Sequence, residues 1–356
     1  MTTADADLLK AASEGNLDAV SRALEAGANV DVKDEYNNTS LNGAALFGHL
    51  EVVKRLLEAG ADIENKGSGG GLTPLANAAS HGHFDLAQFL VDRGARVTDD
   101  LLSVLQTKVN IFAENAERGM VTEEGVAAWK QAQEFFVTQR LRQDLPEAIP
   151  LLSSSDEAVR KNAVRGMAEA GKRGIDLASA ATALAALLSE SDPDVRALAS
   201  GALTYQHGRT GDWPGVQTLL ASGDMRVRAA ACEALISVER AEASLTSSLG
   251  TLLQDAEAEV RKIAAIAVAT LPRKGVDATS LVPRMIELLT DAEPTVRRSA
   301  AFAFSLWSKH GLRDYCAPAL PVLRSVTERD DNDAVRHFAA QVLAASEDED
   351  SVSDRR

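Results

Sequence analysis

Apolar residues recur at helical spacing through the first hundred residues, in pairs of segments separated by glycine. In the second pair, Val52, Val53, Leu56 and Leu57 form an apolar stripe, and charged residues take the opposite side of the predicted helix. Glycines follow the segments in two series: Gly15, Gly48 and Gly82, then Gly27, Gly60 and Gly94. Both series advance by 33 and 34 residues. The pattern predicts three units, each made of a short helix, a glycine turn, a longer amphipathic helix and a glycine C-cap.

A different repeat begins near residue 145, where an apolar helix precedes a short phrase that is kept most fully in "DPDVR" at Asp192–Arg196. The arginine of the phrase recurs six times: Arg160, Arg196, Arg228, Arg261, Arg297 and Arg336. Four residues earlier stands an acid or an amide: Asp156, Asp192, Asp224, Glu257, Glu293 or Asn332. Three residues later stands an alanine: Ala163, Ala199, Ala231, Ala264, Ala300 or Ala339. The phrase therefore predicts six helix pairs that pack closely at a small residue.

Both repeats resemble known families. "TPL" at Thr73–Leu75 and "GHLEVVKRLLEAGAD" at Gly48–Asp62 are similar to the ankyrin repeat family. The phrase around Asp192–Arg196 resembles the HEAT repeat family, including its PBS-lyase HEAT-like members. The resemblance implies an all-α fold, an elongated α-solenoid in which an ankyrin stack precedes a HEAT superhelix with one concave face. Asn42 and Ala76 replace the ankyrin histidine that forms hydrogen bonds between neighbouring turns. A less rigid stack of repeats is therefore expected there.

The recurring acids and arginines predict a structural ladder. An acid at the start of the second helix caps that helix, and the arginine fork reaches a carboxylate of the neighbouring repeat. The residues assigned to this ladder are Asp156, Arg160, Asp192, Arg196, Asp224, Arg228, Glu257, Arg261, Glu293, Arg297 and Arg336.

The chain divides on these patterns into four segments. Residues 1–100 hold about three ankyrin units and residues 144–346 about six HEAT units. Between them, residues 101–143 predict two helices that belong to neither repeat and that cover the open end of each array. The charged stretch 347–356 predicts a disordered acidic tail.

Charge and cysteine usage narrow the class of protein. The net charge of -15 disfavours nucleic acid as a partner, because a duplex needs clustered Lys and Arg. Two cysteines without a CxxC pair favour neither a disulfide scaffold nor a zinc site. The start lacks the basic and apolar regions of a signal peptide, and no apolar run is long enough for a membrane span. A cytoplasmic protein is expected.

The motifs that suggest chemistry have simpler explanations. The glycines of "NKGSGGGLTP" at Asn65–Pro74 lack the lysine of a phosphate loop, and they fall where the repeat gains one residue. They predict a lengthened ankyrin finger. His81 and His83 have no third ligand at a metal-binding spacing. No catalytic constellation appears, so we expect neither an enzyme nor a cofactor or metal.

Two surfaces are candidates for binding a partner protein. The first comprises the ankyrin finger tips, where exposed Tyr36 is a typical interface residue; its residues are Lys33, Asp34, Tyr36, Asn37, Asn38, Lys66 and Ser68. The second is the HEAT concave face, with the residues Lys262, Ile266, Arg298, Phe302 and Leu306. This row forms an apolar patch rimmed by charge if it faces the concavity. The alternative is that curvature of the superhelix buries the side chains of this row.

These observations favour a non-catalytic scaffold or adaptor that binds partner proteins. A HEAT-type nucleic-acid-binding protein is one alternative, since HEAT-like DNA glycosylases exist, although residues 146–345 carry 22 Lys and Arg against 25 Asp and Glu. A lyase-associated or immunity partner protein is another. The identity of the partner and self-association stay open.

Overall fold

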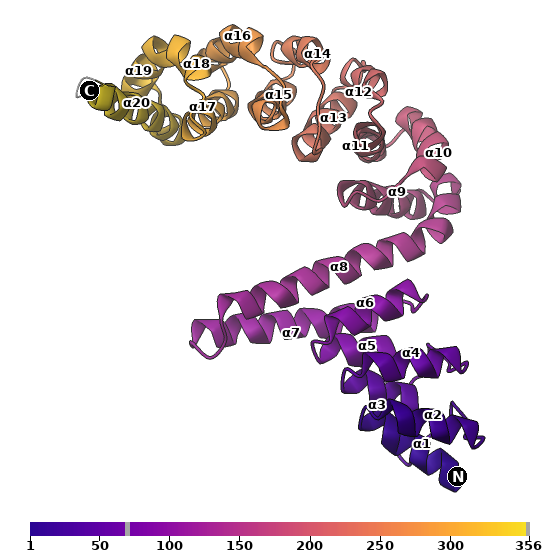
Figure 1. The fold of residues 1–356 in the computed structure, drawn as a ribbon. Helices are drawn as coiled ribbons and strands as arrows, with labels where there is room; N and C mark the ends of the chain where they lie inside the picture. Colours follow the sequence, from indigo (N-terminus) through magenta and orange to yellow (C-terminus); the bar gives the residue numbers. More distant parts are fainter. Residues whose placement is uncertain (68–71, 354–356) are drawn as a thin grey trace. The chain divides into compact units, whose positions relative to one another are not determined.

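The computed structural model describes residues 1–67 and 72–353, with side chains described as far as Ser346. The fold is all-α and 74% helical, and the described residues contain no β-strand beyond an isolated bridge between Lys33 and Thr39. The chain forms two compact units, Met1–Asp144 and Leu145–Arg356. Figure 1 shows the helices of each unit packed one after another in chain order.

The first unit contains three helix pairs that match the predicted repeats. Their bounds are α1 Thr3–Ser13 and α2 Leu17–Glu25, α3 Ser40–Leu46 and α4 Leu50–Glu58, α5 Pro74–Ser80 and α6 Phe84–Asp92. Thr39 and Thr73 begin the second and third pairs, because each side chain accepts the N–H of the third following residue. The apolar stripe of α4 is buried, with Val52, Val53 and Leu56 at most 1% exposed.

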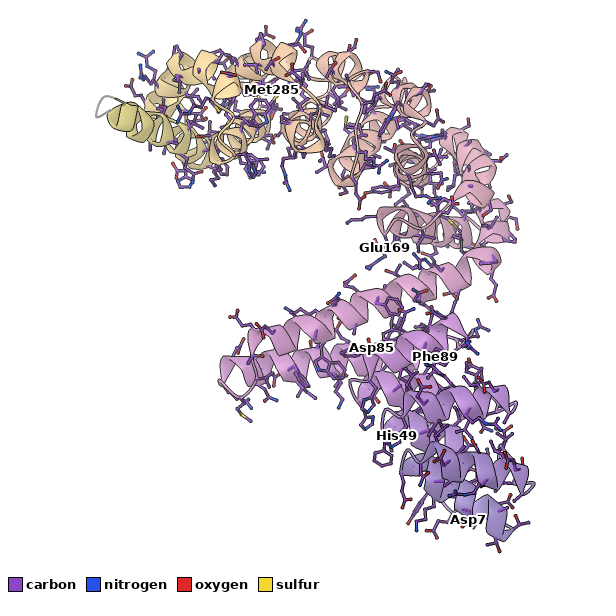
Figure 2. The ribbon with its side chains drawn as sticks, in the orientation of Figure 1. Asp7, His49, Asp85, Phe89, Glu169 and Met285 are labelled. Carbon is purple, nitrogen blue, oxygen red and sulfur yellow. The ribbon has the colours of Figure 1, made fainter. Side chains whose placement is uncertain are left out.

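Glycine and histidine join consecutive ankyrin units. His49 Nε2 donates to the Ser13 carbonyl at 3.0 Å, and His83 Nε2 donates to the Leu46 carbonyl at 3.1 Å. Each ring lies against the glycine turn of the preceding unit, where a Cβ on Gly15 or Gly48 would stand 2.6 Å from the ring. These glycines also have positive φ, so both space and backbone conformation require glycine. Figure 2 marks His49.

Polar groups link the fingers of successive units. Asp31 accepts the N–H of Asp62 at 3.0 Å, and Glu64 accepts the N–H of Arg96 at 2.7 Å. Asn42 Nδ2 donates to the Asn65 carbonyl at 2.8 Å. The expectation that Asn42 removes a tie between turns is therefore wrong, because its amide donates as the usual imidazole would.

Two long helices, α7 Asp99–Glu117 and α8 Glu123–Ala148, follow the ankyrin pairs and cover the last repeat, and α8 ends four residues beyond the first unit. Trp129 of α8 lies 3.8 Å from the Cβ position of Gly82, the place that histidine takes in the earlier units. Its ring also meets Phe84 edge-on at 5.1 Å between centroids. Further along α8, Gln143 donates to the Ala95 carbonyl and accepts the N–H of Val97. The cap thus supplies the contacts that a fourth repeat would make.

The second unit is built of two helical layers (Figure 1). The inner layer, on the inside of the curve of this unit, holds α9 Glu157–Lys172, α11 Pro193–Thr210, α13 Met225–Ser237, α15 Ala258–Thr270, α17 Pro294–Lys309 and α20 Asp333–Ser353. The outer layer holds α10 Ala181–Ala186, α12 Trp213–Leu220, α14 Leu245–Leu252, α16 Val282–Glu287, α18 Arg313–Cys316 and α19 Leu320–Arg329. Short 3₁₀ segments join several of them, and buried Met285 of α16 lies between the layers (Figure 2).

The recurring alanines are buried within the packed inner helices. Ala199, Ala231, Ala264, Ala300 and Ala339 are fully buried, and Ala163 is 7% exposed. A larger side chain at these positions would separate the helices, which explains why the repeat keeps alanine there. Helix α20 continues to Ser353, into the stretch for which the sequence predicts a tail.

Each repeat arginine does two things at once. Its Nη1 donates to the carbonyl six residues earlier, at the end of the preceding outer segment, in all six repeats. The same fork then reaches a carboxylate of the next repeat. The five pairs between repeats are Arg160–Glu190 at 3.2 Å, Arg196–Asp224 at 2.5 Å, Arg228–Asp255 at 2.7 Å, Arg261–Asp291 at 2.8 Å and Arg297–Asp330 at 2.7 Å. Arg336 of the last repeat pairs with Asp333 of its own helix.

The partners of the ladder differ from the predicted ones. Only Asp224 is both an assigned acid and a ladder acceptor. Asp156 caps α9, and Asp192 caps α11 and pairs with Lys161. Glu257 and Glu293 make no side-chain cap, because the aspartate two residues earlier accepts their backbone N–H and also receives the arginine.

The cap predicts a specific stability effect. Replacing Trp129 by alanine removes the ring that covers Gly82 and Phe84, so the free energy of unfolding of the first unit should fall by about 3 kcal/mol. Chemical denaturation followed by circular dichroism measures this loss. The control is Met120→Ala, since that side chain is 70% exposed and should change stability little. Equal midpoints for the two variants would contradict the capping role of Trp129.

The ladder predicts loss of stability on acidification. Burial opposes ionisation of Asp255, Asp291 and Asp330, but bonds from an arginine and a backbone N–H outweigh it, so each pKa lies below its ordinary value. A lowered pKa stabilises the fold above the unfolded value of about 3.9, and this contribution disappears as pH falls through the folded value. The urea midpoint of the second unit should therefore drop between about pH 5 and pH 3.

A triple Asp→Asn variant at these positions tests the assignment. It should be less stable than the parent at pH 7 and should lose less stability on acidification. The control places Gln at three exposed glutamates of the same unit: Glu239, Glu287 and Glu328. If the control flattens the pH dependence as much as the Asn variant does, the ladder is not its source.

Candidate functional site

The inner layer of the second unit presents three rows of equivalent residues, which we call the inner face. The first row is Lys161, Ala197, Ala229, Lys262, Arg298 and His337. The second row is Arg165, Gly201, Glu233, Ile266, Phe302 and Gln341. The third row is Glu169, Tyr205, Ser237, Thr270, Leu306 and Ala345. All except Ala229 reach solvent, so curvature does not bury the rows. Glu169 is marked on α9 in Figure 2.

A groove of about 480 Å³ lies on the inner face over α9, α11 and α13. We call it the Tyr205 groove. Its floor is made of small or short apolar residues, namely Ala168, Ala197, Leu198, Gly201, Ala230 and Ala234. Gly201 matters most, because a Cβ added there meets nothing within 4 Å. The equivalent residues of later repeats are Ile266 and Phe302, so the missing side chain at Gly201 contributes to the hollow.

Tyr205 forms one wall of the groove and is half-buried. Its side chain packs on α9, since a Cβ on Gly171 would lie 3.0 Å from Tyr205 Cβ. Burial raises the pKa of Tyr205, a hydrogen bond with Ser237 opposes the shift, and the Glu233 and Glu169 carboxylates add to it. The two carboxylates therefore place negative potential at the phenol.

Basic residues line the α9 side of the groove. Lys161 Nζ lies 2.9 Å from Asp192 and 2.8 Å from Asp194, and these bonds raise the pKa of Lys161. Arg165 and Lys172 are exposed and make no ion pair within the part of the chain that the structure describes. The groove thus combines an aromatic wall, free cations on one border and carboxylates beside the ring.

Further along the inner face, aromatic residues form a second feature. Phe302 of α17 is 38% exposed and meets Phe338 of α20 edge-on, with 5.4 Å between ring centroids. With the half-buried Ile266 and Leu306 in the neighbouring row positions, they make an apolar set that we call the Phe302 patch. Arg298 is exposed beside it, whereas Lys262 pairs with Glu259 at 2.6 Å.

Phe338 and the Tyr205 groove were not predicted from the sequence. Phe338 follows the repeat arginine by two residues, outside the rows that the pattern selected. The groove forms where one repeat lacks a side chain. The repeat pattern identifies residues that recur, so it does not identify a position where the residue is missing. The signal for it was Gly201 in a row otherwise filled by larger residues.

The ankyrin fingers are placed as follows. Tyr36 is 65% exposed on a turn held by Asp34, whose carboxylate accepts the N–H of Tyr36 at 2.9 Å and of Asn38 at 2.8 Å. Asn37 adopts the left-handed φ of 59° that this turn requires. Asp34 therefore shapes the finger. The remaining predicted residues are Lys33 and Lys66, which are exposed, and Ser68, which lies outside the described residues with the glycines that follow it.

The described residues contain no group of three His, Cys, Asp or Glu side chains that could hold a metal ion. His81 and His83 each direct a ring nitrogen to a backbone carbonyl, of Asn77 and Leu46 respectively. Burial raises the pKa of Cys232 and of Cys316 to about 12, which leaves both thiols protonated at neutral pH. No described helix is both long and apolar enough to cross a membrane.

Lys274 is a half-buried basic residue that follows α15. Burial lowers the pKa of this lysine to about 8, assisted by the charge of Arg273. Its Nζ donates to the carbonyls of Leu235 and Ile236 at the end of α13. Lys274 therefore caps the C-terminus of a neighbouring inner helix.

Comparisons with known proteins agree with this architecture. The ankyrin repeat family (3 copies) matches residues 8–100 and the HEAT repeat family matches residues 145–236. The family described as non-SMC mitotic condensation complex subunit 1 matches residues 225–315. The chain thus consists of ankyrin repeats followed by HEAT repeats, both typical of protein-interaction scaffolds.

Solved structures and curated proteins add little to this assignment. The chain is similar to a crystal structure of an engineered protein, with 24% sequence identity and a TM-score of 0.43. The similarity covers 57% of this chain and 96% of that one. The search of curated proteins found no match.

The hollow at Gly201 predicts tolerance of a large side chain. Gly201→Leu should fill the groove and keep or raise the free energy of unfolding by up to about 1 kcal/mol, since glycine is unfavourable inside a helix. Gly171→Leu is the matched control in α9, where an added Cβ would lie 3.0 Å from Leu177 and Tyr205. It should lose about 2 kcal/mol through overpacking. Denaturation curves compare the two; equal losses would mean that Gly201 has no free space.

Proposed function

We propose that the protein is a non-catalytic scaffold that binds a partner protein along the inner face of its HEAT repeats, with the ankyrin fingers as a second contact surface. The observation that carries this proposal is the position of Phe302. Among the described residues of the second unit, Leu151 and Phe302 are the exposed large apolar side chains, and Phe302 lies on the inner face beside Phe338. An exposed aromatic group with a charged neighbour such as Arg298 is typical of a protein-binding surface.

The family matches support the same class of function. Ankyrin and HEAT arrays present extended surfaces, and the matched condensation-complex family is by its name a subunit of a larger assembly. A partner that binds across several helices would contact both the Phe302 patch and the Tyr205 groove, because both lie on the same rows.

The side-chain pairing argues for a protein partner over nucleic acid. Four of the six first-row residues are basic or histidine, but Lys161 and Lys262 are already paired with carboxylates. Phosphate binding depends on cations that release counterions, and paired lysines contribute less to it. The row therefore offers few cations for a duplex.

Affinity capture with the full chain tests the proposal. Phe302→Glu places a charge in the apolar patch and should reduce recovery of a bound partner at least about tenfold, a loss typical of a central interface residue. Tyr36→Ala tests the fingers in the same way. The matched control is Ser247→Glu, an exposed position on outer helix α14. Circular dichroism should show that all variants are folded.

The outcome is decided by comparison of variants. A partner that is lost with Phe302→Glu and kept with Ser247→Glu supports the inner face. A partner that is lost with Tyr36→Ala alone would move the main surface to the fingers. Recovery that is equal for every variant would contradict both assignments.

A further inference from the structure

The Tyr205 groove has the shape to receive a side chain from a partner. Its volume of about 480 Å³ lies within the range of roughly 300–1,000 Å³ that is usual for ligand sites. The floor of alanines, Leu198 and Gly201 suits an aliphatic stem, which long charged side chains lay along apolar surface. The open Gly201 position lets such a stem approach the backbone of α11.

The carboxylates near the Tyr205 ring favour a positively charged side chain of the partner in the groove. The carboxylates of Glu169 and Glu233 both act on the Tyr205 phenol, and a tyrosine ring itself attracts a cation to its face. Glu233 is exposed and makes no ion pair in the described part of the chain. Glu169 is paired with Arg173 of its own helix at 2.6 Å. A carboxylate placed at the ring would be repelled by the unpaired Glu233 carboxylate.

The border of α9 sets a further condition on the partner. Arg165 and Lys172 belong to α9, where Glu169 is already paired with Arg173, whereas the unpaired Glu233 belongs to α13. Charge complementarity therefore favours a segment that carries an acidic residue near its basic one, with the basic residue at the ring and the acidic residue at α9.

We propose that the Tyr205 groove binds a lysine or arginine side chain of a mixed-charge polypeptide segment, with the cationic group over the Tyr205 ring between Glu169 and Glu233. The inference rests on the proposed role of the inner face in binding a partner protein. It identifies the chemistry of the bound residue, which the Phe302 patch does not specify.

Selection from a displayed library of random twelve-residue peptides tests the proposal. The full-length chain is the bait, and peptides that also bind Gly201→Leu are removed, because that variant has the groove filled. The expected result is an enriched set with one invariant Lys or Arg and a nearby Asp or Glu. Replacement of the basic residue by norleucine in a selected peptide should weaken binding at least about tenfold.

Protein variants then locate the cation. Glu233→Gln and Glu169→Gln should each weaken binding of the selected peptide about threefold to tenfold, and Tyr205→Leu should do the same. Higher salt should weaken binding to the parent more than to the Gln variants, since screening acts on the lost charge pair. Glu328→Gln on outer helix α19 is the charge-matched control and should bind as the parent does.

Three results would overturn the inference. They are failure to enrich any peptide over Gly201→Leu, a consensus that lacks a basic residue, and equal affinity of the parent and the two Gln variants. Each leaves the scaffold proposal to be judged by Phe302→Glu. Loss of partner capture in that variant, together with failure of the peptide selection, would retain the inner face and reject the cation site.

Discussion

The arginine ladder is the interaction on which the second unit depends. Every arginine fork donates to the carbonyl six residues earlier, and the first five also pair with a carboxylate of the next repeat. One side chain thus fixes both a helix end and the step between repeats. These groups are mostly buried; the pair Arg297–Asp330 has side-chain exposures of 13% and 5%. Loss of one partner would leave an uncompensated charge in a poorly solvated place. Because the step repeats, equivalent residues of the inner helices fall into rows, and those rows are the inner face.

In the first unit, successive repeats are also joined by a recurring contact, made by a histidine ring against a glycine turn. His49 and His83 fill the space over the preceding glycine turn, and the stack ends where Trp129 takes that space. The Gln143 amide makes hydrogen bonds to the Ala95 carbonyl and the Val97 N–H, which follow the last ankyrin helix. A repeat array must cover its terminal apolar face. Trp129 and Gln143 cover it with two side chains about four helical turns apart on one helix.

The sequence predicts the fold well because both repeats recur at a fixed period, and it predicts contacts less well. The ladder arginines are where the pattern places them, yet Asp255 and Asp291 accept them in place of Glu257 and Glu293, and Asp330 accepts Arg297. An aspartate two residues earlier satisfies both the backbone N–H and the arginine, and its shorter side chain favours that turn. Asn42 was expected to weaken the stack and instead donates across it. These outcomes depend on side-chain reach, which spacing does not report.

The inner face differs from the ladder in what restrains its residues. The ladder arginine and the alanine three residues later keep one residue type through six repeats, because pairing and packing require it. The second row changes from Arg165 to Gly201, Glu233, Ile266 and Phe302, although every member has the same place on its helix. The fold tolerates all of these groups, so folding alone does not determine the sequence of this row. The consequence is a surface with a hollow at Gly201 and an exposed ring at Phe302, two shapes that the repeat packing does not require.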